Sequence, residues 1–156
     1  MTRKTLLLHA LSVYLAFAST ALAKPNLAGE WKLNLDKSDF GPLPSPKSRT
    51  DKIAQDDGAV IVSVSVSNAQ GDFTYNLRYA TDGSETKNEI FGNPATSTAK
   101  WDGEALAVET KGTFQGNDYT AKDRYTVSAD GKTLTVERRL ASAMGEADQK
   151  LIFDKQ

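Results

Sequence analysis

Residues 123–140 read DRYTVSADGKTLTVERRL, two short runs in which apolar and polar residues alternate, joined at Asp130-Gly131. Alternation with a period of two is typical of a half-buried β-strand. Asp-Gly is a favoured hairpin turn because glycine adopts positive φ freely and aspartate tolerates it. The stretch therefore predicts a β-hairpin, but each apolar series contains one charged residue, Asp123 in the first run and Arg138 in the second.

A two-residue turn at Asp130-Gly131 fixes which residues of the two runs face each other. The predicted pairs on the inward face are Val127 with Leu134, Tyr125 with Val136, Asp123 with Arg138, and Ala121 with Leu140. A charge left alone in a core-facing position costs several kcal/mol, whereas an opposed carboxylate and guanidinium satisfy each other. We therefore expect Asp123 and Arg138 to be partners.

The same turn dipeptide recurs along the chain, at Asp57-Gly58, Asp82-Gly83 and Asp102-Gly103. The alternating runs between the turns predict ten strands, at about residues 28–35, 48–56, 59–67, 72–80, 85–91, 96–101, 104–112, 118–128, 132–141 and 148–154. Sequential strands joined by tight turns form an antiparallel meander, which leaves two exposed edges unless it closes. We therefore predict an all-β fold, an antiparallel up-and-down β-barrel of about 8–10 strands. A two-sheet sandwich is the alternative.

The first 23 residues have the features of a secretory signal peptide. Arg3 and Lys4 precede a mostly apolar run, and Ala21-Leu22-Ala23 is a small-x-small cleavage signal. The apolar run is shorter than the roughly 20 residues that a spanning helix needs. We expect residues 1–23 to be cleaved off, export to the periplasm or the outside of the cell, and a single β-barrel domain over residues 24–156.

The composition excludes several kinds of chemistry. The chain has no cysteine, and its one histidine, His9, lies in the predicted signal peptide. The mature chain therefore has no Ser-His-Asp or Cys-His catalytic set, no His or Cys zinc site and no disulfide. The Asp-Gly turns lack the spacing of a calcium loop. A formal net charge of −1 gives no reason to expect nucleic acid or an anionic membrane as a partner. We expect no enzyme activity, no cofactor, no metal and no membrane insertion of the mature chain.

Gly29-x-Trp31 opens the first predicted strand, and Arg138 lies on a late, inward-facing one. This combination resembles the calycin superfamily of lipocalins and fatty-acid-binding proteins. Asn117-Asp118-Tyr119 is similar to the lipocalin Thr-Asp-Tyr signature, with its first residue changed. The resemblance implies a lipocalin-like barrel whose base is closed by Gly29 and Trp31, with Arg138 packed across the indole ring.

Other features separate the chain from these families. The lipocalin disulfides and C-terminal helix are missing, and the segment from Pro42 to Pro46 replaces the helical lid of the fatty-acid-binding proteins. Proline excludes a helix there, so we expect this segment to run extended across one end of the barrel. Trp31-Lys32-Leu33 and Lys37-Ser38-Asp39-Phe40 resemble small secreted bacterial lipocalin-like proteins of unassigned function.

The leading functional hypothesis is a secreted or periplasmic barrel that binds a small, partly hydrophobic ligand. The candidate ligand-binding residues are the inward aromatics and the charged pair: Phe73, Tyr75, Tyr79, Asp123, Tyr125 and Arg138. The alternative is an envelope structural or interaction protein with a filled barrel and no ligand. Barrels of about eight strands occur both filled and hollow, so the pattern leaves open whether Asp123 and Arg138 only lock the barrel or also face a ligand.

Overall fold

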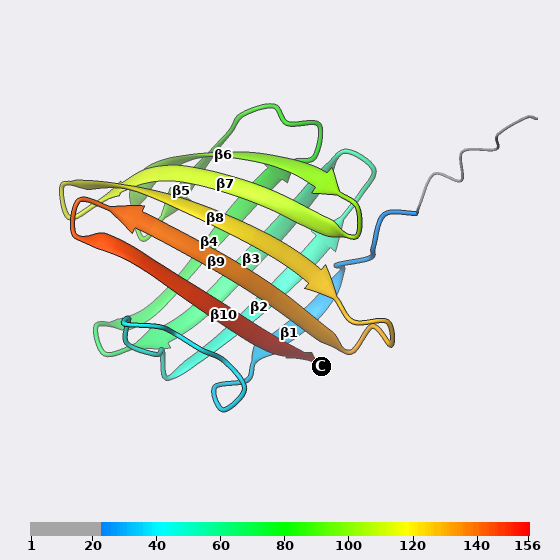
Figure 1. Cartoon of the computed structure of the whole chain (residues 1–156), viewed down its shortest axis with the longest axis horizontal. Coiled ribbons are helices and arrows are strands. Elements are labelled where there is room, and N and C mark those ends of the chain that lie inside the picture. The colour runs from blue at the N-terminus through cyan, green and yellow to red at the C-terminus, as the bar shows by residue number, and fades with distance from the viewer. Residues whose placement is uncertain (1–22) are drawn as a thin grey trace, which may run out of the picture.

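Ten antiparallel strands curl into a barrel in the computed structural model, which describes residues 23–156 (Figure 1). The strands are β1 (Gly29–Leu33), β2 (Ser48–Gln55), β3 (Ala59–Asn68), β4 (Gly71–Ala80), β5 (Thr86–Ile90), β6 (Asn93–Asp102), β7 (Ala105–Phe114), β8 (Asn117–Val127), β9 (Thr133–Ser142) and β10 (Gly145–Lys155). They form one sheet in the order β4-β3-β2-β1-β10-β9-β8-β7-β6-β5. The predicted up-and-down barrel is confirmed, and each predicted strand is present.

The predicted signal peptide lies outside the described residues except for Ala23. Over the part of the chain that the structure describes, no helix is long and apolar enough to cross a membrane.

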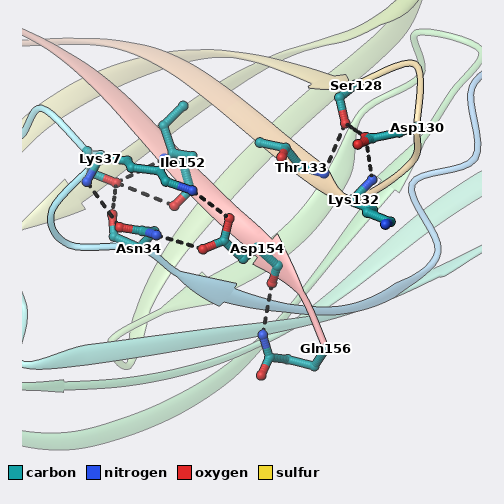
Figure 2. Close-up of polar contacts among 10 residues, drawn as sticks. Asn34, Lys37, Ser128, Asp130, Lys132, Thr133, Ile152, Asp154 and Gln156 are labelled. Carbon is teal, nitrogen blue, oxygen red and sulfur yellow. Dashed lines mark hydrogen bonds and ion pairs between the residues drawn. The ribbon is translucent and has the colours of Figure 1, made fainter.

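The hairpin of β8 and β9 has the predicted register but a different turn. Val127 pairs with Leu134 and Asp123 with Arg138. The turn is longer than the two residues predicted, because the last ladder contact joins Ser128 to Thr133. The Asp130 carboxylate holds this loop by accepting hydrogen bonds from the Ser128 hydroxyl (2.6 Å) and the Lys132 amide (3.0 Å) (Figure 2). The longer loop keeps the same parity, so the inward and outward faces are unchanged.

Left-handed backbone occurs at the glycine of three of the four Asp-Gly turns, Gly83, Gly103 and Gly131, but at none of their aspartates. Two other turns are left-handed at both central residues. Phe91-Gly92 joins β5 to β6 with φ of 51° and 77°, and Gln115-Gly116 joins β7 to β8 with φ of 51° and 78°. Positive φ at both central residues is the geometry of a type I′ hairpin turn, which matches the twist of the flanking strands. The glycine second in each pair fits that geometry, whereas Phe91 and Gln115 hold it at a steric cost.

The barrel has a packed base, at the end where β1 begins and β10 ends. Its largest fully buried side chains include Leu27, Trp31, Leu134 and Phe153. The Trp31 indole N–H donates to the Leu27 carbonyl (2.8 Å), so the one polar atom of the ring is satisfied inside the core.

The cation over the Trp31 ring is Lys155, with its ammonium nitrogen 5.2 Å from the ring centre. The contact of Arg138 with this ring, implied by the family resemblance, is therefore not formed. The register of β1 and β10 places Lys155 directly opposite Trp31. Gly29 makes room for it: its φ is +144°, and a Cβ there would lie 2.9 Å from the Lys155 side chain.

The opposite end of the barrel is its mouth, formed by the turns at residues 69–70, 91–92, 115–116 and 143–144 and by the loop between β1 and β2. This loop pairs with β10 through Asp39 and Lys150, and Phe40 packs against the core. Leu43 and Pro44 then line the opening. The proline-rich segment thus lies at one end of the barrel, as predicted, but it begins with a turn rather than an extended run, because the Leu43 amide donates to the Phe40 carbonyl (3.2 Å).

Candidate ligand-binding cavity

A cavity of about 460 Å³ occupies the mouth half of the barrel. It is lined mainly by apolar and aromatic side chains together with a few polar ones: Leu43, Pro44, Arg49, Tyr75, Leu77, Tyr79, Ile90, Phe91, Thr110, Thr113, Phe114, Asn117, Tyr119, Ala121, Asp123, Arg138, Leu140, Ser142, Met144 and Gln149. The barrel is therefore neither wholly filled nor wholly hollow. Side chains fill its base, and a cavity remains at its mouth.

An aromatic cluster centred on Phe91 forms one wall of the opening. The Phe91 ring meets Tyr75 at 5.1 Å and Phe73 at 5.2 Å between ring centroids, both edge-on, and Phe114 at 6.3 Å. Edge-to-face contacts of this kind add to the stability gained by burial. Phe91, Phe114 and Met144 remain exposed, so the rim presents apolar surface at the entrance.

Asp123 and Arg138 form a two-pronged ion pair, as the predicted register requires. The Arg138 Nε and Nη2 atoms donate to the two Asp123 oxygens at 2.7 and 2.8 Å. The side chain of Asp123 is 3 % exposed and that of Arg138 is 23 % exposed, and both line the cavity. The attraction of the nearby Asp123 carboxylate holds the pKa of Arg138 well above its usual range. The Arg138 guanidinium therefore stays protonated.

A second ion pair of the same geometry joins Arg49 and Asp51 on β2. The Arg49 Nε and Nη2 atoms donate to the two Asp51 oxygens, both at 2.8 Å, and Asp51 is fully buried. Burial lowers the pKa of Arg49, but the attraction and hydrogen bonding of Asp51 outweigh it, so the pKa lies above its usual value. The Arg49 guanidinium also lies 5.5 Å from the centre of the Phe153 ring.

The second pair was not predicted from the sequence, although it shows the same pattern, charged residues within an inward-facing alternating series. Arg49, Asp51 and Ile53 are alternate residues of one strand, so they share a face. Ile53 is buried, which places both charges on the inward side. Two opposite charges within an inward series thus indicate an interior ion pair, as Asp123 and Arg138 do.

Three tyrosines of the site, Tyr79, Tyr119 and Tyr125, have phenol pKa values above the usual one. Tyr79 and Tyr125 lie between the core and the cavity, with ring centroids 6.3 Å apart, and burial raises the pKa of both phenols. Burial also raises the pKa of Tyr119, which is partly exposed in the cavity wall. Tyr75 and Tyr79 line the cavity with the charged pair, whereas Phe73 packs behind Phe91 and Tyr125 behind Tyr79.

The site offers hydrogen bonding and apolar contact. Within residues 23–156, no three acidic, histidine or cysteine side chains gather as they would to hold a metal ion.

The barrel resembles proteins of known structure at low sequence identity. The sequence matches no protein-family model and no curated protein sequence.

The fold is shared by several solved structures. A secretory abundant heat soluble (SAHS) protein from Ramazzottius varieornatus superposes with a TM-score of 0.61 at 15% identity, over 83% of this chain and 95% of that one. Zebrafish ileal bile acid-binding protein complexed with cholic acid gives 0.57 at 13% identity, over 83% and 98%. Secretory abundant heat soluble protein 4 from Ramazzottius varieornatus gives 0.53 at 16% identity, over 83% and 94%. The likeness is one of fold, and it agrees with the antiparallel up-and-down barrel that the sequence predicted.

Proposed function

We propose that the protein is an exported barrel that binds a small, partly apolar ligand in the mouth cavity. The observation that carries this proposal is the cavity itself. Its volume of about 460 Å³ falls in the range of roughly 300–1,000 Å³ typical of small-ligand sites. Apolar walls with a few converging polar groups are also typical of such sites. The features of residues 1–23 support export to the periplasm or the extracellular space.

The cavity favours this function over an envelope interaction protein with a filled barrel. An aromatic wall around an open volume is suited to enclosing a ligand, whereas a scaffold gains stability by filling that volume. The zebrafish neighbour is named as a bile acid-binding protein and holds cholic acid, which supports a binding role. The proposal assigns the protein no catalytic step.

Uptake of the uncharged fluorescent probe N-phenylnaphthylamine tests the proposal. We expect its emission to rise on addition of the purified protein and to saturate at one probe per chain. Leu140 lines the cavity, so Leu140→Trp should fill part of it and weaken probe binding by at least about tenfold. Ala141 follows on the opposite face of β9, so Ala141→Trp is the matched control and should bind the probe normally.

Two results contradict the proposal. One is the absence of saturable probe binding by the folded protein. The other is equal probe binding by both variants, which would place the probe outside the cavity. Organic extraction of protein purified from its own cell envelope, followed by mass spectrometry, then identifies the natural ligand as a stoichiometric small molecule.

A further inference from the structure

The charges inside the mouth cavity cancel. Arg49, Asp123 and Arg138 line it, and Asp51 lies directly behind Arg49. Each guanidinium is paired with one carboxylate, and each pair uses both carboxylate oxygens. Two positive and two negative groups therefore give the interior no net charge.

Each guanidinium still has hydrogen-bond donors to offer. Both pairs use Nε and Nη2, and neither Nη1 atom donates to a partner within residues 23–156. In that part of the chain, no buried side-chain nitrogen or oxygen lacks a hydrogen-bond partner. The two Nη1 atoms therefore keep exposed surface, and both arginines line the cavity.

The free energy of entering this cavity is less favourable for a charged ligand than for a neutral one. A carboxylate entering the cavity loses its water, meets two guanidinium groups that are already neutralised, and approaches the Asp123 carboxylate. An ammonium group also loses its water, meets carboxylates that are already neutralised, and approaches the Arg138 guanidinium. A hydroxyl or carbonyl oxygen accepts a hydrogen bond from Nη1 without adding a charge.

We propose that the cavity selects uncharged amphiphiles with an oxygen acceptor, such as long-chain alcohols and esters, over carboxylates or amines of the same chain length. This inference rests on the proposed function and names the ligand class of the same site. The acceptor is placed at Arg138 and Arg49, and the chain lies along the aromatic wall of Tyr75 and Phe91 toward the rim.

Three matched competitors test the inference: dodecanol, dodecanoate and dodecylammonium, each used to displace N-phenylnaphthylamine at neutral pH. Dodecanol should displace the probe at a concentration at least about tenfold lower than either ion. If dodecanoate competes as well as or better than dodecanol, the selectivity is overturned and the proposed function stands. If the protein takes up neither the probe nor any competitor, both proposals fail.

A charge-unbalancing variant gives a second test. Asp123→Asn leaves the Arg138 guanidinium without its carboxylate, so dodecanoate should become the better competitor. Asp102→Asn is the control, because Asp102 pairs with Arg124 on the outer surface and its loss should leave the order unchanged. The double variant Asp123→Asn/Arg138→Gln removes both charges and should prefer dodecanol. An unchanged preference for dodecanol in folded Asp123→Asn contradicts the inference. If that variant does not fold, the order in which the three competitors displace the probe from the unmodified protein decides.

Discussion

The barrel is held together along two seams that differ in kind. Between β1 and β10 the backbones form a regular antiparallel ladder, in which Trp31 pairs with Lys155 and Leu33 with Phe153. Between β4 and β5 no backbone ladder forms, although both strands lie within the described residues. Side chains of β5 bridge that seam. Asn88 accepts a hydrogen bond from the Arg78 amide (2.8 Å) and donates to the Arg78 carbonyl (3.1 Å), and the Thr86 hydroxyl donates to the same carbonyl (2.7 Å).

The difference shows how a ten-stranded sheet closes into a barrel when its two edge strands, β4 and β5, do not pair with each other. The side-chain amide of Asn88 offers the same donor and acceptor as a peptide group, so it takes the place of a missing ladder rung. It also donates to Ser97 on β6 (3.0 Å). The ladder seam distributes its hydrogen bonds over several residues of both strands, whereas the bridged seam concentrates them on Arg78, which meets Asn88 and Thr86.

The largest expected effect concerns the core beneath the ladder seam. Trp31 is fully buried, so Trp31→Ala removes a large apolar side chain and leaves a cavity at the base. We expect the free energy of unfolding to fall by about 3–5 kcal/mol, measured by urea denaturation. Phe91→Ala, at the half-exposed rim, should cost only about 1 kcal/mol. Equal losses in the two variants would contradict the division into a packed base and an open mouth.

A smaller effect is expected at the bridged seam. Asn88→Ala removes both contacts to Arg78 and leaves the Arg78 amide without its acceptor. We expect a loss of about 1–3 kcal/mol in the free energy of unfolding, together with faster hydrogen exchange at that amide. Unchanged exchange at Arg78 would show that Asn88 does not bridge the seam.

The smallest effect is expected for the matched asparagine beside the ladder seam. Asn34 is also half-buried and donates to the Asp154 carboxylate (2.6 Å) (Figure 2). Its backbone amide donates to the Ile152 carbonyl (2.8 Å), a contact that Asn34→Ala keeps. We therefore expect a loss below about 1 kcal/mol and unchanged exchange at the Asn34 amide. A loss as large as that of Asn88→Ala would remove the distinction between the seams.

The Asn34 contact also predicts a pH dependence. Its hydrogen bond lowers the pKa of Asp154 below the usual value of 3.8. A carboxyl group whose pKa is lower in the folded state adds stability above its unfolded pKa and loses it as the pH falls. The difference between the native protein and Asn34→Ala should therefore be present at neutral pH and disappear in acid.

Much of this fold follows from local patterns. Alternation gave the ten strands and the inward faces because a strand has a side-chain period of two. It also placed Asp123 opposite Arg138, since parity alone decides which residues share a face. The turns were less predictable: the Asp130 loop is longer than expected, and both central residues are left-handed at Phe91-Gly92 and Gln115-Gly116 rather than at the Asp-Gly turns. Strand pairing can impose a turn that the turn residues themselves do not favour.

The sequence by itself determined the strands, their register within the β8–β9 hairpin and the need of each interior charge for an opposite partner, because these depend on residues close in the chain or on parity. Only the tertiary structure decided that Lys155, rather than Arg138, covers Trp31, and that Asn88 bridges the seam between β4 and β5. It also decided that the barrel is filled at its base and hollow at its mouth. These features depend on how the closed sheet curves and on the volume left when side chains from distant strands meet, which no local pattern records.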